Sequence, residues 1–110
     1  MKNSLKLILT LSFIFSASSA FAKLPEYTTT IKNHRFEPAS IEVPAGKKFK
    51  LIVKNLDKTL EEFESHDLRK EKIVSGGKQI KMIIKPLKPG TYKFEGEFHA
   101  KTAQGVLIAK

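Results

Sequence analysis

Apolar and polar residues alternate along most of this chain, in short runs separated by turn residues. The clearest runs are YTTTIK (27–32), ASIEV (39–43), KFKLIVKN (48–55), QIKMII (79–84), TYKFEGEF (91–98) and GVLIAK (105–110). A period of two places every second side chain on the same face of a strand. Short strands with turn signals about every 8–12 residues are typical of all-β sandwiches and small barrels. The pattern therefore predicts an all-β fold.

Two stretches depart from this alternation. Residues 57–71, DKTLEEFESHDLRKE, are compatible with a helical turn or with a strand end followed by a loop. Residues 23 to 27 show no strand pattern, and we expect a loose leader there. Met82 alternates with Ile80 and Ile84, so we expect it to pack in the core rather than to bind a metal.

The first 22 residues have the features of a secretory signal peptide. Lys2 and Lys6 precede an apolar run, and Ala20-Phe21-Ala22 has the small-x-small pattern of a cleavage site. The alternative is an uncleaved anchor helix, but the run is short for a bilayer span, which needs about 20 residues. We therefore expect cleavage after residue 22. A single domain, residues 23–110, would remain in the periplasm with no stable membrane insertion.

The chain is basic and contains no cysteine. It has 20 Lys and Arg against 11 Asp and Glu, for a net charge of +9, and loss of the two signal-peptide lysines leaves +7. The lysines are spread along the strands without interleaved aromatic residues, which argues against nucleic-acid binding. A solvated surface is the simpler interpretation, and attraction to an anionic partner is the alternative. Without cysteine, disulfides and thiolate metal ligands are excluded.

Acidic residues are concentrated in two segments of this basic chain. They are Glu61, Glu62, Glu64, Asp67 and Glu71, followed by Glu95 and Glu97. Neighbouring carboxylates repel one another unless lysines or a bound cation offset the charge. Together with one or two histidines they suit Cu(II), Fe, Mn or Zn rather than Cu(I). The alternative is a charged loop whose acids pair with Arg69, Lys70 and neighbouring lysines.

The three histidines differ in their surroundings. His99 follows the aromatic strand and is the one that we expect to bind a metal. His34 precedes a strand and is expected to be exposed, and His66 lies in the polar loop and is expected to be solvated. No nucleophile elbow, phosphate-binding glycine loop or HExxH motif is present. The sequence therefore favours binding over catalysis.

Several motifs resemble those of a cupredoxin-like domain. They are FEPASIEVPAG (36–46), VKNLD (53–57) and PLKPGTYKF (86–94), followed by His99 and Gly105. The segments EEFESHDLRKEKIV (61–74) and GEFHAKTAQGVLIA (96–109) resemble, more narrowly, the EfeO-type cupredoxin-like group. Those proteins are exported and occur fused to, or encoded beside, bacterial iron-uptake components. The resemblance implies a cupredoxin-like Greek-key β-sandwich of seven to eight strands, with a metal site between two loops at one end.

The resemblance also shows where this chain departs from blue copper proteins, whose pattern is Tyr-x-Phe-x-Cys-x-x-His. Gly96 stands at the cysteine position and His99 keeps the histidine. The methionine position falls at 103–104, and the upstream histidine position falls at 61–62. A type 1 copper centre is excluded because it requires a thiolate.

The resemblance implies a metal site made of carboxylates and one histidine instead. Its ligands would be Glu62, Glu64, Glu97, His99 and Glu61. Phe63 and Phe98 would pack beneath them. If 92–98 is a regular strand, Glu97 instead points outward. The pair Glu71-Lys72 would form either an ion pair or part of the site.

These expectations give a leading function and two alternatives. The leading one is a periplasmic metal-binding protein that serves bacterial iron uptake, with a copper or iron ion bound. Its partners would be a periplasmic metal-binding protein or an inner-membrane permease. The first alternative is a metal-free adaptor that docks on such a partner. The second is a ferroxidase-like component, which would need a partner for redox turnover.

Overall fold

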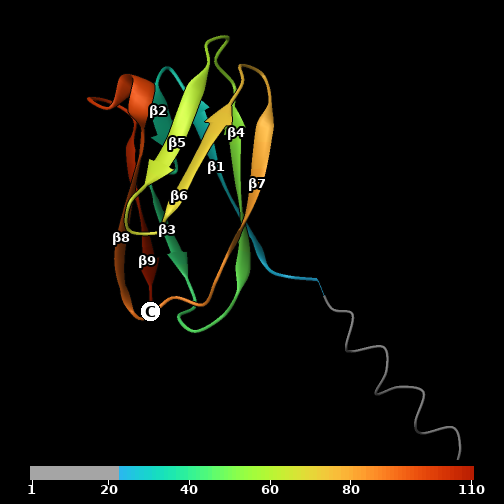
Figure 1. The fold of residues 1–110 in the computed structure, drawn as a ribbon, viewed down its shortest axis with the longest axis vertical. Helices are drawn as coiled ribbons and strands as arrows, with labels where there is room; N and C mark the ends of the chain where they lie inside the picture. Colours follow the sequence, from blue (N-terminus) through green and yellow to red (C-terminus); the bar gives the residue numbers. More distant parts are fainter. Residues whose placement is uncertain (1–22) are drawn as a thin grey trace, which may run out of the picture.

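The structure is a computed structural model that describes residues 23–110, so the predicted signal peptide lies outside the described residues. Nine strands and one short 3-10 helix form a β-sandwich (Figure 1). The elements are β1 (Glu26–Lys32), β2 (Arg35–Glu37), β3 (Ser40–Val43), β4 (Phe49–Asn55), β5 (Glu61–Ser65), β6 (Lys70–Val74), β7 (Gln79–Ile84), β8 (Gly90–Gly96), η3 (Glu97–His99) and β9 (Gln104–Ala109). None of the helices in this part of the chain is long and apolar enough to cross a membrane.

The strands form two sheets, with the orders β2-β1-β4-β7 and β3-β9-β8-β5-β6. The pairs β1–β4 and β3–β9 are parallel, and the other neighbours are antiparallel. The all-β sandwich is thus confirmed, with nine strands among the described residues rather than seven or eight. The three-residue β2 is one strand that the alternation pattern did not predict.

The core follows the predicted alternation. In β4, Phe49, Leu51 and Val53 are at most 1% exposed, because alternate side chains of a strand point to the same face. Phe94 of β8 packs against Phe36 of β2, with ring centroids 4.9 Å apart. All buried side-chain nitrogen and oxygen atoms of the described residues have hydrogen-bond partners. The expectation that Met82 belongs to the core is confirmed, since it is 6% exposed.

Two segments without a clear alternation pattern in the sequence contain strands. The 57–71 segment contains no helix, and it supplies β5 and the start of β6, which pair as an antiparallel hairpin. The expected leader at 23–27 already includes the first residues of β1. There the carbonyl of Pro25 accepts a hydrogen bond from the Lys50 N–H at 2.9 Å. Both segments are ordered by strand pairing, which depends on partners distant in the sequence.

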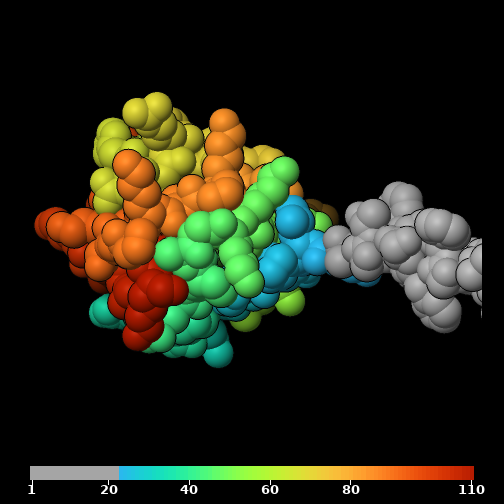
Figure 2. Space-filling model, turned by 90° about the horizontal axis from the view of Figure 1, so that it is seen from below, coloured from blue at the N-terminus to red at the C-terminus, as the bar shows by residue number. Residues whose placement is uncertain are grey.

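The strand register places the loops at two opposite ends. One end, here called the site end, holds the β1–β2 turn, the β4–β5 loop and the segment 97–103, which contact one another through side chains. The other end holds the β3–β4 loop, the β7–β8 loop and the C-terminal residue. There the Gly46 N–H donates to the Leu87 carbonyl at 2.8 Å, and the Ala45 N–H to the Lys110 carbonyl at 3.2 Å. Figure 2 looks directly at this second end.

Candidate metal site

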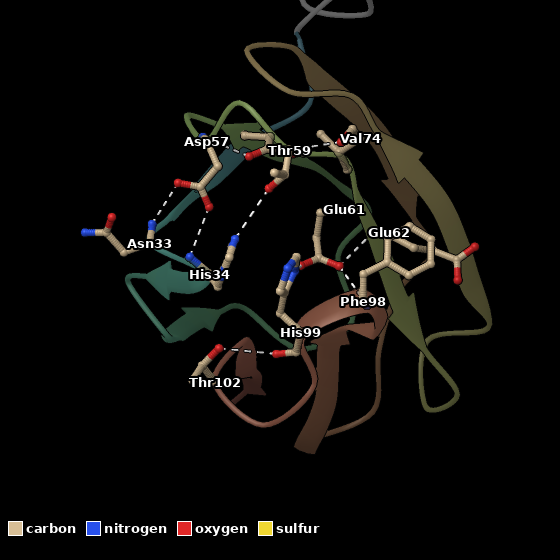
Figure 3. A network of polar contacts seen from close by, with 11 residues as sticks. Asn33, His34, Asp57, Thr59, Glu61, Glu62, Val74, Phe98, His99 and Thr102 are labelled. Carbon is tan, nitrogen blue, oxygen red and sulfur yellow. Dashed lines mark hydrogen bonds and ion pairs between the residues drawn. The ribbon is translucent and has the colours of Figure 1, made fainter.

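Glu61 is a buried carboxylate at the start of β5, and it is 1% exposed. Its Oε2 accepts a hydrogen bond from His99 Nδ1 at 2.7 Å (Figure 3). Its Oε1 accepts hydrogen bonds from the backbone N–H groups of Glu62 and Phe98, both at 2.9 Å. Burying a carboxylate is costly unless such donors satisfy it. Glu61 therefore links β5 to η3 through contacts within the protein.

Gly96 makes this arrangement possible. A Cβ atom at position 96 would lie 2.7 Å from Cδ and Oε2 of Glu61 and 2.8 Å from Cβ of Ala103. These separations are too short for packed carbon and oxygen atoms, so only glycine leaves room for the carboxylate. Position 96 is the one at which the resemblance placed the lost cysteine. The Glu61 carboxylate fills the space beside it, so the residues do not fit a type 1 copper ion, for which the chain also has no thiolate.

His34 is part of this site, although the sequence indicated an exposed residue. Its ring stacks on that of His99, with centroids 3.5 Å apart and planes 13° apart. Asn33 and His34 form a two-residue turn with φ values of 52° and 58°, in the left-handed region that tight hairpins favour. Asp57 accepts hydrogen bonds from both N–H groups, at 2.8 and 3.0 Å. This turn was not predicted from the sequence, and the ring contact depends on tertiary structure.

The pKa of Asp57 reflects this support. Burial raises the pKa of Asp57, but the hydrogen bonds from the His34 and Asn33 N–H groups and the electrostatic interactions with His34 and His99 outweigh it. The net result is a pKa below the usual value of 3.8. The ionised carboxylate therefore holds the turn in place at neutral pH.

A second group of acids lies on the outer face of the larger sheet. Its members are Glu62 and Glu64 of β5, Glu71 of β6 and Glu97 of η3. Each offers a carboxylate oxygen, and these oxygens all lie within 4.8 Å of one another. Glu64 and Glu71 are direct cross-strand partners. We call these four residues the outer carboxylate cluster.

Hydrogen bonding and repulsion shift the pKa values in this cluster. The hydrogen bond with Glu97, burial and the charge of Glu71 raise the pKa of Glu62 to about 7. The pKa of Glu64 is raised as well, first through its hydrogen bond with Glu97 and then by burial. The same hydrogen bonds lower the pKa of Glu97. Glu97 is thus the most acidic of these three carboxyl groups, whereas Glu62 and Glu64 take up protons more readily than ordinary glutamates.

The structure separates the five predicted ligands into two groups. Strand alternation turns Glu61 inward to His99, whereas Glu62 and Glu64 face outward to Glu97. Glu97 points outward although it lies in η3 rather than in a regular strand. Among the described residues, no ion pair joins Glu71 to Lys72.

The structure also tests the positions that the sequence predicted for Phe63, Phe98 and His66. Phe63 is fully buried beneath the site, as predicted. Phe98 was expected to pack there too, but this prediction is wrong because its side chain is 49% exposed. The turn of η3 ends the strand alternation after Gly96, so Phe98 leaves the face that Phe94 occupies. His66 is solvated as expected, with a 93% exposed side chain that contacts Glu64 at 3.1 Å.

Comparison with known proteins identifies the family. The family model of the cupredoxin-like domain matches residues 5–109. The chain belongs to this family. The uncharacterized protein RP394 of Rickettsia prowazekii (strain Madrid E) is 53% identical over 83 residues, which cover 76% of this chain and 66% of that protein. This cupredoxin-like chain therefore spans just under two thirds of the length of that relative.

Solved cupredoxins share the fold at low sequence identity. Auracyanin A, a blue copper protein from Chloroflexus aurantiacus, superposes with a TM-score of 0.66 and 13% identity, covering 77% of this chain and 98% of auracyanin. The metal-binding domain of the Cu(I)-exporting P-type ATPase CopA from Streptococcus pneumoniae D39 gives a TM-score of 0.65 and 11% identity, covering 77% and 84%. These similarities establish the cupredoxin-like fold.

Proposed function

We propose that this cupredoxin-like protein is exported to the periplasm and binds iron there through the outer carboxylate cluster, as a component of bacterial iron uptake. The observation that carries the proposal is the convergence of four glutamate oxygens within 4.8 Å, drawn from β5, β6 and η3. Like charges held so close repel one another. A bound cation would relieve this repulsion.

The donor set favours iron over copper. The cluster offers carboxylate oxygens, which suit hard cations, while the imidazole Nδ1 of His99 is engaged by Glu61. Among the described residues, the imidazole that contacts this cluster and could add a nitrogen ligand is that of His66, beside Glu64. Copper(II) is the less suitable ion because it prefers nitrogen ligands. Iron would be the cargo of this protein.

The role in iron uptake rests on the two segments that resemble the EfeO-type group. Segment 61–74 contains Glu62, Glu64 and Glu71, and segment 96–109 contains Glu97, so the resemblance and the cluster involve the same residues. A periplasmic metal-binding protein or an inner-membrane permease would receive the ion. The periplasmic location rests on the predicted signal peptide.

The proposal is tested by calorimetric titration of residues 23–110 with Fe(II) under anaerobic conditions, and with Mn(II) and Cu(II). We expect one-to-one iron binding that weakens at least about tenfold in Glu62→Gln/Glu97→Gln, equivalent to a loss of about 1.4 kcal/mol. Glu37→Gln/Glu42→Gln is the matched control, because it removes the same charge from exposed residues outside the cluster. Equal affinities of both variants, or no binding below millimolar iron, would contradict the proposal.

A metal-free adaptor is the second candidate. It is favoured by the closure of the interior site by Glu61 and by the exposed side chains of Leu60 and Phe98, which are 47% and 49% exposed near that site. An adaptor would support iron uptake in cells equally well with the Glu62→Gln/Glu97→Gln variant. A ferroxidase-like component would instead have to oxidise Fe(II) in the presence of a partner.

A further inference from the structure

Exposed lysines gather at the end of the sandwich opposite the site end. They are Lys23, Lys47, Lys48, Lys85, Lys88 and Lys110, and we call this group the basic end. In Figure 2 the first described residues (blue), the β3–β4 loop (green), the β7–β8 loop (orange) and the C-terminal residues (red) all face the viewer. Lysines that are scattered along the sequence therefore form one surface in the folded protein.

The strand register explains this gathering. The parallel strands β1 and β4 begin together, with Glu26 beside Lys50. The parallel strands β3 and β9 end together, with Val43 beside Ala109. The β7–β8 loop then joins the β3–β4 loop through the hydrogen bond to the Leu87 carbonyl. The lysines of these loops, of the first described residue and of the C-terminal residue thus share one side of the molecule.

Carboxylates neutralise little of the positive charge on this surface. Two side-chain carboxylates of the described residues lie at this end, where Glu26 pairs with Lys50 at 3.5 Å and Glu42 pairs with Lys110 at 3.1 Å. Within residues 23–110, no carboxylate forms an ion pair with any of the other five lysines of the basic end. The surface therefore carries a concentrated positive charge that is complementary to an anionic partner.

The composition of this surface favours a lipid membrane over an acidic protein. Specific protein interfaces depend on apolar and aromatic residues at their centre. Among the large exposed apolar side chains of the described residues, Ile83, the cross-strand partner of Lys50, lies beside this end, and none lies in its loops. Attraction to anionic lipid headgroups needs only clustered lysines, each contributing about 1 kcal/mol near the surface.

The point at which the N-terminal segment connects to the domain is consistent with a membrane partner. Lys23 lies three residues before the start of β1, so the chain enters the domain at the basic end. The apolar run of residues 1–22 is the segment that the sequence predicts to engage the membrane during export, so the basic end is the part of the domain nearest to that segment before the expected cleavage. We propose that the basic end docks reversibly on anionic lipid headgroups, which leaves the outer carboxylate cluster facing solution. This inference goes beyond the proposed function and does not depend on it.

Vesicle co-sedimentation tests the inference with residues 23–110, which contain both complete sheets of the described fold. We expect binding to vesicles of phosphatidylglycerol and phosphatidylethanolamine, little binding to phosphatidylcholine vesicles, and weaker binding as salt increases. Lys47→Glu/Lys88→Glu should lower the partition coefficient roughly 30-fold or more, as expected for the loss of two surface lysines. Lys58→Glu/Lys101→Glu is the matched control, since these exposed lysines lie at the site end and the charge change is equal.

The outcomes separate this inference from its alternatives. A selective loss of binding in the basic-end variant supports docking through this end. Equal losses in both variants would show that net charge alone attracts the protein, and would overturn the inference. Absence of binding to anionic vesicles would overturn it as well, and binding to polyglutamate in that case would assign the basic end to an acidic protein. Iron titration of the same variants tests the proposed iron binding independently of membrane binding.

Discussion

At the scale of single residues, Gly96 and Glu61 depend on each other. The backbone of Gly96, with φ of −93° and ψ of 107°, is one that any residue can adopt. Replacing glycine by alanine in such a conformation normally stabilises a protein by about 0.4–1 kcal/mol through the unfolded chain. Here the new Cβ would lie 2.7 Å from the Glu61 carboxylate. We expect Gly96→Ala to lower the free energy of unfolding by about 1–3 kcal/mol, because overpacking outweighs the entropy gain.

A double-mutant cycle measured by urea denaturation isolates this contact. Glu61→Ala removes the carboxylate that the added methyl group would meet, so Gly96→Ala should cost less in that background. The contact with Ala103 Cβ, at 2.8 Å, remains in both backgrounds and leaves a residual cost. Identical costs in the two backgrounds would show that Gly96 does not make room for Glu61.

At the scale of elements, the contact between β5, β6 and η3 should make stability depend on pH. The pKa of Glu62 is about 7 in the folded protein, above its ordinary value of 4.5. The folded state therefore binds more protons than the unfolded state between about pH 4.5 and 7, and stability falls as the pH rises through that range. The raised pKa of Glu64 acts in the same direction. The lowered pKa of Glu97 has the opposite effect on stability, which it raises with increasing pH, but this effect lies below pH 4.5.

Urea denaturation of the metal-free protein at several pH values measures this dependence. We expect Glu62→Gln to flatten the decline between pH 4.5 and 7, because it removes the main titrating group of the cluster. Glu42→Gln serves as the control, since Glu42 pairs with Lys110 outside the cluster. A decline that persists unchanged in Glu62→Gln would refute the assignment of this pH dependence to the outer carboxylate cluster.

The same elements show how far the sequence predicted the structure. Alternation predicted β4, β7, β8 and β9, because their inward residues are regularly apolar. It missed the pairing of β5 with β6, where the exposed face is charged and the edge strand β6 has few buried residues. The acidic segments and His99 were found from composition and spacing. The separation of these residues into two groups was not predicted, because it follows from whether each side chain in β5 points inward or outward.

His34 marks another limit of prediction from sequence. Its contact with His99 joins residues from the β1–β2 turn and η3 that are far apart in the chain. The local signal, an asparagine before the histidine, is compatible with a tight turn but does not indicate what the turn touches. The contact is fixed by Asp57, which reaches the turn from the β4–β5 loop.

At the scale of the whole molecule, contacts within the protein hold the site end together at the position that the resemblance to copper proteins assigns to a metal. Glu61 joins β5 to η3 by two hydrogen bonds, from the Phe98 N–H and from His99 Nδ1, and His34 stacks on His99 from the β1–β2 turn. We therefore expect EDTA to leave the thermal unfolding of residues 23–110 unchanged. Glu61→Gln keeps the size of the side chain but loses its charge, and should cost about 1–2 kcal/mol. That corresponds to a fall in Tm of roughly 4–16 °C for a domain of this size.

Added iron should then stabilise the fold without disturbing this arrangement. An ion that binds the outer carboxylate cluster raises Tm with concentration, because it binds the folded state alone. The Glu61–His99 hydrogen bond would persist when the ion binds. Zinc serves as a diamagnetic probe for NMR spectroscopy. It should shift the resonances of the carboxylate carbons of the cluster and leave those of the His99 ring nitrogens unchanged. If zinc shifted Nδ1 of His99 and Glu61→Gln weakened its binding, the metal would instead enter the interior site. The sandwich would then have kept the position of the copper site and exchanged a thiolate for Glu61.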